Sequence, residues 1–401
     1  MRRIMPSIFY AVFFLSLILT SCDLSKPISN TMITSTSSPL NPKTGELTDS
    51  YSANSQEITN TVENNNPIMS TPPYGLYNIL PRQDISITSD NVDQIVELAY
   101  INYRPPVLWL PIDNTLIASP SGSSFDLLDL SSSVIKKRSI TVSPFGLRFS
   151  PNEKYFASTF FEEDNFGIYN FSDGSAIGII SSDLQSPGYT AITTAFSPDS
   201  EILATVFGDM QIKLWHLPDL SLIRTISCEC FIYSVVFSPD GKSLVTGGLD
   251  GVVTIFNLSD ETQFQLQNNL ENISMSLANV AFSKDGKYIA AAGLEDNGSN
   301  FSGLVRVWNV ADRNEIYYLL FDNWVSGIAF SPNNEVLAVN ANDLYILNAI
   351  DGKILSQFRP IPDDTSGLGV NSDTIAFSPD GSMLASASQA GNFVYIWGLP
   401  K

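Results

Sequence analysis

The stretch Phe237-Ser238-Pro239-Asp240-Gly241 decides the fold, because close copies of it return along the chain. The copies begin at Phe149, Phe196, Phe282, Phe330 and Phe377. Successive phenylalanines lie roughly 40 to 50 residues apart, which is the period of a propeller blade. In the Phe237 stretch, which the copies follow with small changes, Phe ends a short apolar strand and Pro fixes φ at the first corner of a type I turn. Asp can bond the turn backbone, and Gly accepts the φ that the exit of the turn requires.

The unit around Phe237 predicts four short antiparallel strands, at residues 232–237, 242–247, 252–258 and 262–267. No convincing helical periodicity appears from residue 80 onward. A degenerate first unit is expected at residues 107–130, where Trp109-Leu110-Pro111 replaces the Phe-Ser-Pro phrase. The sequence therefore predicts an all-β chain of seven four-stranded units.

Closure of the seven units is predicted from the two ends of this region. The last unit ends at its third strand, residues 393–397, and residues 93–100 have the pattern of the missing fourth strand. We expect residues 94–100 to pair with residues 392–399, because this pairing removes an exposed sheet edge.

Tryptophan stands at one place in several third strands, at Trp215, Trp308 and Trp397. With the period and the turn, these residues resemble the WD-repeat (tryptophan-aspartate) β-propeller family from about residue 90 to the end. The resemblance implies a seven-bladed propeller that acts as a protein-interaction scaffold without catalysis. Unlike many members, the chain has no Gly-His pair before an inner strand, so the buried His–Asp network of the family is expected to be absent. Three aspartates match the family's turn aspartate between second and third strands: Asp209, Asp250 and Asp343.

The N-terminus has a basic start at Arg2 and Arg3, an apolar run over residues 8–19, and the closing tetrapeptide Leu19-Thr20-Ser21-Cys22. This pattern is typical of a secretory signal, and the tetrapeptide resembles the bacterial lipobox. The resemblance implies a signal peptide at residues 1–21 and lipidation of Cys22. The protein would be exported and anchored to the outer face of the cytoplasmic membrane, or to an outer membrane. An uncleaved signal anchor with an incidental cysteine is the alternative.

Residues 22–80 are rich in Ser, Thr, Asn and Pro and are expected to form a disordered tether before a propeller at residues 81–401. The formal net charge of −20 argues against nucleic acid and anionic lipid head groups as partners. A protein partner, basic in character, fits this charge better, although simple solubility is also consistent with it.

Acidic and aromatic residues gather in loops that the resemblance places on one face, called the top. That face carries the loops from second to third strands and from each fourth strand to the next first strand. The candidate partner-binding residues are Glu162, Glu163, Asp164, Tyr189, Trp324, Asp363 and Asp364. The alternative is a generally acidic, solvated surface.

The sequence favours no catalytic site, no metal site and no cofactor. Its one histidine, His216, lies within a third strand, where a structural role is expected. Cys228 and Cys230 lie close together in a predicted loop; they form either a disulfide or two separate small side chains. An envelope-assembly component, and after it a cofactor- or metal-dependent propeller enzyme, are the alternative functions.

Overall fold

The computed structural model describes residues 83–101, 103–121, 124–130, 136–142, 146–160, 165–181, 191–228, 231–266, 274–296, 301–341, 343–359, 374–387 and 393–400. The expected signal peptide at residues 1–21, Cys22 and the expected tether at residues 22–80 lie outside these residues. Within them, none of the helical structure is long and apolar enough to cross a membrane.

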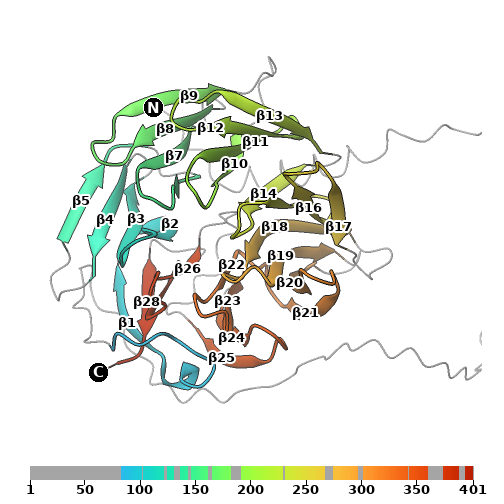
Figure 1. Cartoon of the computed structure of the whole chain (residues 1–401). Coiled ribbons are helices and arrows are strands. Elements are labelled where there is room, and N and C mark those ends of the chain that lie inside the picture. Colours follow the sequence, from blue (N-terminus) through green and yellow to red (C-terminus); the bar gives the residue numbers. More distant parts are fainter. Residues whose placement is uncertain are drawn as a thin grey trace, which may run out of the picture. The chain divides into compact units, whose positions relative to one another are not determined.

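The described residues form seven antiparallel sheets of four strands each, arranged as the blades of a propeller (Figure 1). Blade 1 consists of β2 (Arg104–Trp109), β3 (Thr115–Ser121), β4 (Ser124–Asp129) and β5 (Lys136–Ile140). Blade 2 consists of β6 (Arg148–Phe149), β7 (Tyr155–Phe160), β8 (Asn165–Asn170) and β9 (Ala176–Ser181). Blade 3 consists of β10 (Ala191–Phe196), β11 (Ile202–Phe207), β12 (Gln211–His216) and β13 (Leu222–Ser227).

The next three blades follow the same order. Blade 4 consists of β14 (Ile232–Phe237), β15 (Ser243–Gly248), β16 (Val253–Asn257) and β17 (Gln263–Leu266). Blade 5 consists of β18 (Ser274–Phe282), β19 (Tyr288–Asp296), β20 (Phe301–Asn309) and β21 (Glu315–Phe321). Blade 6 consists of β22 (Gly327–Phe330), β23 (Val336–Ala341), β24 (Asp343–Asn348) and β25 (Ile354–Phe358). The fold class and the strands predicted around Phe237 are confirmed.

Blade 7 closes the ring as predicted, because its fourth strand comes from the N-terminal side of the propeller. It contains β26 (Ile375–Phe377), β27 (Met383–Ala387) and β28 (Val394–Gly398), and β28 pairs with β1 (Val96–Ile101). The register places Val96 opposite Gly398 and Ile101 opposite Val394. A short 3-10 helix, η1 (Val92–Gln94), precedes β1.

The apolar core is divided among the seven interfaces between neighbouring blades, with one cluster of buried side chains in each. Blades 4 and 5, for example, pack Val245 and Ile255 against Ile289 and Trp308. The phenylalanines that end the inner strands lie in or against these clusters: Phe196, Phe237, Phe282, Phe330 and Phe377. Each blade is therefore held by its two neighbours, as in other repeat folds.

The repeated phrase forms the predicted turn between first and second strands. In blade 4 the Gly241 amide donates to the Ser238 carbonyl at 2.9 Å, and Gly241 has a φ of +71°. The Asp240 carboxylate accepts from the Ser238 hydroxyl at 2.6 Å and from the Lys242 amide at 3.1 Å. The equivalent residues at positive φ in other blades are Glu153, Ser200, Gly286, Asn334 and Gly381.

These turns also touch one another around the face opposite the top, called here the bottom. Where the positive-φ residue is Ser200 or Asn334, its side chain accepts an amide of the preceding blade's turn, from Asn152 or Asp285. Where it is glycine, the proline of the preceding turn packs on the backbone, as Pro198 does on Gly241. The phrase thus contributes contacts between blades as well as a local turn.

Candidate interaction face

Most of the predicted partner-binding residues lie outside the described residues: Glu162, Glu163, Asp164, Tyr189, Asp363 and Asp364. Cys22 and Cys230 also lie outside them. Trp324 and Cys228 are described, and both are half-buried. Trp324 is therefore the one predicted partner-binding residue within the described part of the chain.

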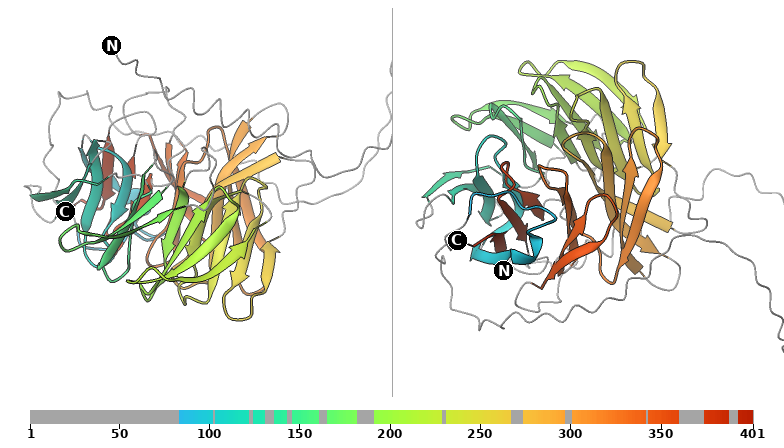
Figure 2. Two further views of the ribbon diagram at one scale, coloured as in Figure 1. Left: turned by 90° about the horizontal axis from the view of Figure 1, so that it is seen from above. Right: turned by 60° about the horizontal axis from the view of Figure 1, so that its bottom comes forward.

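Blade 5 extends beyond its neighbours at the top face, where Figure 2 shows its long strands. β18, β19 and β20 each have nine residues, whereas β14 and β15 of blade 4 have six. Three additional residues lengthen a strand by about 10 Å. Phe301, the first residue of β20, lies on this extension and is 54% exposed.

The loop from β21 to β22 packs against the extension and brings Trp324 to it. A Cβ atom at Gly303 would lie 2.0 Å from the Asn323 carbonyl oxygen, so only glycine permits this approach. Phe301 and Gly303 are two residues apart on β20 and therefore share a face of the strand. Phe301 therefore shares a face of β20 with the glycine that the β21–β22 loop approaches, and we call this end of β20 and the loop residues Asp322 to Trp324 the blade 5–6 corner.

Aromatic and polar side chains of blades 5 and 6 follow the corner along the chain. Phe321 contacts Tyr345 edge-to-face, with 5.0 Å between ring centroids. The pKa of Tyr345 is raised, first by burial and then by the charges of Asp343 and Asp322, while Arg359 lowers it. Asp322 itself is exposed. The corner thus combines an exposed aromatic ring with an exposed carboxylate.

Several top-face acids have partners inside the fold. Asp209 lies 3.7 Å from the Lys213 ammonium, and both side chains are almost fully buried. Asp343 accepts from Gln357 Nε2 at 2.6 Å and from Arg359 Nε at 3.2 Å. These carboxylates support neighbouring strands, so their charge is largely compensated within the protein.

Two acids near the top face lie within strands, and one of them, Asp343, was expected in a turn. Asp343 is the first residue of β24, and Glu295 belongs to β19 because the blade 5 hairpin is longer than the repeat predicts. Burial raises the pKa of Glu295, and the charge of Arg306 opposes this. The Arg306 guanidinium is fully buried, donates to Glu315 at 2.6 Å and lies 5.2 Å from the Trp308 ring.

Two of the third-strand tryptophans donate hydrogen bonds to hydroxyl groups of the second strand. Trp215 Nε1 donates to the Thr205 hydroxyl at 2.9 Å, and Trp397 Nε1 donates to the Ser386 hydroxyl at 2.8 Å. These two hydrogen bonds were not predicted, although the sequence contains a signal for them. The hydroxyl residue stands on the second strand, two residues beyond the partner of the tryptophan.

His216 and Cys228 have structural surroundings. His216 Nδ1 lies 2.8 Å from Asp219 in an exposed turn. The Ser221 hydroxyl donates to the same carboxylate rather than to the imidazole, so this histidine does not activate that serine. Burial, followed by the charge of Asp209, raises the pKa of the Cys228 thiol to about 12, which keeps it protonated at neutral pH. Its pairing with Cys230 stays a prediction.

Metal binding would need clustered ligands. Within the part of the chain that the structure describes, no three His, Cys, Asp or Glu side chains gather in a way that could hold a metal ion. The strand ends and loops of the described top face are supported by the blade interfaces below them.

Comparison with known proteins identifies the repeats. Residues 184–216, 220–257 and 370–398 match the family model "WD domain, G-beta repeat". The chain therefore carries WD40 repeats within its seven-bladed propeller.

Curated relatives cover parts of the chain. WD repeat-containing protein SL1-17 of Schistosoma mansoni is 25% identical over 47% of this chain and 56% of its own length. Eukaryotic translation initiation factor 3 subunit I of Lodderomyces elongisporus is 29% identical over 33% of this chain and 39% of its own length. Actin-interacting protein 1 of Drosophila melanogaster is 29% identical over 29% of this chain and 19% of its own length. The matches thus span about half or less of these relatives.

Among solved structures, a chain of Kuenenia stuttgartiensis hydrazine synthase superposes with a TM-score of 0.58 at 18% sequence identity. The superposition covers 72% of this chain and 94% of that chain. At this identity the likeness concerns the fold alone.

Proposed function

We propose that this protein is an exported, lipid-anchored scaffold whose propeller binds a protein partner through its top face, without catalysis. The observation that carries the proposal is the blade 5–6 corner, which contains the exposed Phe301 ring and the exposed Asp322 carboxylate. The backbone there depends on the close approach of Asn323 to Gly303. The relatives support it, because one is named as a subunit of a translation initiation factor and another as an actin-interacting protein.

The chemistry of the corner favours a partner segment with a basic residue beside an apolar one. Phe301 would be covered by the apolar side chain, and Asp322 would meet the basic one. The net charge of −20 would attract such a segment at long range. Arg359 forms an ion pair with Asp343, so it competes only in part with a basic partner residue for Asp322.

The test uses residues 80–401, which include all seven blades, as bait in an envelope extract at low and moderate salt. We expect a discrete partner whose binding falls as the salt concentration rises. Phe301→Ala and Asp322→Lys should weaken binding, and charge reversal at Glu162, Glu163, Asp363 and Asp364 should weaken it further. Glu201→Lys, which changes an exposed acid on the bottom face, is the matched control. Failure to bind any protein at either salt would refute the scaffold.

Lipid anchoring is tested separately with the full chain. Labelled palmitate should enter the wild-type protein and should not enter the Cys22→Ala variant, which should leave the membrane fraction. Labelling of the variant, or retention of both proteins as uncleaved precursors, would instead indicate a signal anchor. A stable membrane complex that co-purifies with the anchored protein would favour the envelope-assembly role.

A further inference from the structure

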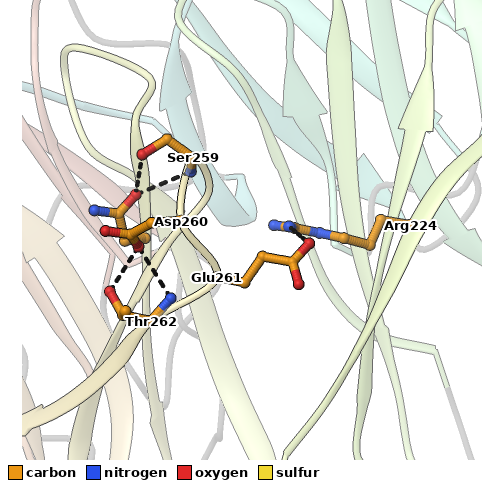
Figure 3. Close-up of polar contacts among 6 residues, drawn as sticks. Arg224, Ser259, Asp260, Glu261 and Thr262 are labelled. Carbon is orange, nitrogen blue, oxygen red and sulfur yellow. Dashed lines mark hydrogen bonds and ion pairs between the residues drawn. The ribbon is translucent and has the colours of Figure 1, made fainter.

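A second set of contacts runs around the perimeter of the propeller, away from the top face. In blades 2 to 6 the turn from third to fourth strand has five residues, with an aspartate in the middle followed by a residue at positive φ. The aspartate accepts the amide of the residue two positions later, as Asp260 accepts that of Thr262 at 3.0 Å (Figure 3). The positive-φ residues are Gly174, Leu220, Glu261, Arg313 and Gly352.

Each of these residues reaches the fourth strand of the preceding blade. Glu261 of blade 4 forms an ion pair with Arg224 of β13 in blade 3, at 2.9 Å (Figure 3). Arg313 of blade 5 lies over the ring of Phe264 of β17 in blade 4, 3.7 Å from its centroid. We call each such contact a latch.

Two further latches match residues by size. A Cβ atom at Gly178 of β9 would lie 2.7 Å from Cδ1 of Leu220, so the leucine side chain packs on the glycine backbone. A Cβ atom at Gly352 would lie 2.6 Å from the Tyr317 ring of β21, so glycine faces tyrosine in the reverse arrangement.

In blade 1, Arg138 of β5 donates to the Ser172 carbonyl of the blade 2 turn at 2.7 Å. Gly174 of the same turn packs on Ile140 of that strand.

The receiving residues occupy one position in the repeat. Each one pairs with the third-strand residue that precedes the tryptophan position; these pairs are Arg138 with Leu127, Gly178 with Ile168, Arg224 with Leu214, Phe264 with Ile255, and Tyr317 with Val307. The position on the fourth strand is therefore the same in blades 1 to 5, while the residues on both sides of the latch vary.

Blade 6 lacks a following turn of this kind, because the fourth strand of blade 7 comes from the other end of the chain. Its equivalent residue, Ser356, donates to the Val92 carbonyl of η1 at 3.4 Å. The segment before β1 thus replaces the missing turn at the point where the ring closes.

We propose that the latches form a matched set that fixes each fourth strand to the blade that follows it in sequence. In each pair the two residues are matched in size or charge. Tyr317 lies against Gly352, Gly178 against Leu220, Arg224 against Glu261, and Phe264 against Arg313. A blade placed beside the wrong neighbour would bring together two large side chains, or would leave a cavity or an unpaired charge.

The proposal is tested by exchanging latch residues in the full chain. Gly178→Leu should lower the melting temperature by about 4 °C or more, because the new side chain meets Leu220. Adding Leu220→Gly should recover most of the loss, since glycine suits the positive φ and frees the space. Arg224→Glu and Glu261→Arg should each cost about 1 to 2 °C, and the double exchange should recover it.

The control combines changes from different latches. Gly178→Leu with Glu261→Arg should give additive losses, because these residues do not touch. Amide hydrogen exchange should rise in β9 for Gly178→Leu and in β13 for Arg224→Glu, and should return to the wild-type rate in the matched doubles. Additive losses in both matched doubles would overturn the proposal, and so would unchanged exchange in the fourth strands. Neither result depends on whether a partner binds the top face.

Discussion

Glu97 should make the stability of the closed ring depend on pH near neutrality. It lies on β1 opposite Trp397 of β28, within the strand pair that closes the propeller. Burial raises the pKa of Glu97 from its usual 4.5 to about 7. Its charge, after burial, also raises the pKa of the neighbouring Tyr395 to about 12.

The direction of this pH dependence follows from proton binding to Glu97 in the folded and unfolded states. Between pH 4.5 and 7 the folded protein keeps a proton on Glu97 that the unfolded chain has lost. The free energy of unfolding therefore falls as the pH rises through this window. At about 1.4 kcal/mol per pH unit, the loss from this residue amounts to about 3 kcal/mol by pH 8.

The Glu97→Gln variant should avoid this loss, because its side chain stays neutral. Urea unfolding of both proteins at pH 5, 6, 7 and 8 measures the difference. The variant should gain on the wild type by about 3 kcal/mol between pH 5 and pH 8. The exposed Glu201→Gln serves as the control and should follow the wild type. Parallel curves for Glu97→Gln and the wild type would refute the reasoning.

Three further substitutions probe the blades. Ser386→Ala removes the acceptor of the buried Trp397 Nε1 and should cost about 1 to 3 kcal/mol, seen as a lower urea midpoint at an unchanged m-value. Arg306→Met should be close to neutral or stabilising, whereas Glu315→Ala leaves the buried guanidinium without its partner and should cost about 3 to 5 kcal/mol; equal losses in thermal unfolding would contradict this. Gly303→Ala forces a Cβ atom against the Asn323 carbonyl and should cost about 1 to 3 kcal/mol; partner binding should fall with it if the corner is the docking point, and an unchanged melting temperature would argue against the close approach.

The sequence predicts the ring because its decisive signals are local and repeated. Phe237 to Gly241 specify a turn through their own chemistry, and the copies reveal the period. Closure was also predictable, since an unfinished last blade and a spare strand before the first blade complete each other.

The contacts between blades were not predictable in the same way. Glu261 and Arg224 are far apart in the repeat, and their meeting depends on the radial stacking of two blades. The blade 5 extension was missed because its additional residues around Glu295 have the composition of a loop. Trp324 was identified as a top-loop residue, but the close approach of its loop to β20 depends on the fit of Asn323 over Gly303.

Closure of the ring brings the two ends of the described propeller together. The Gln83 amide donates to the Leu399 carbonyl, and its side chain donates to the Pro400 carbonyl, both at 2.9 Å. A short linker could therefore join residue 400 to residue 83 while new ends are opened at a turn elsewhere. Such a circular permutant would have a continuous strand connection in blade 7 and a nick in another blade. The order of the blades in space, rather than the place where the chain starts, would then determine the architecture.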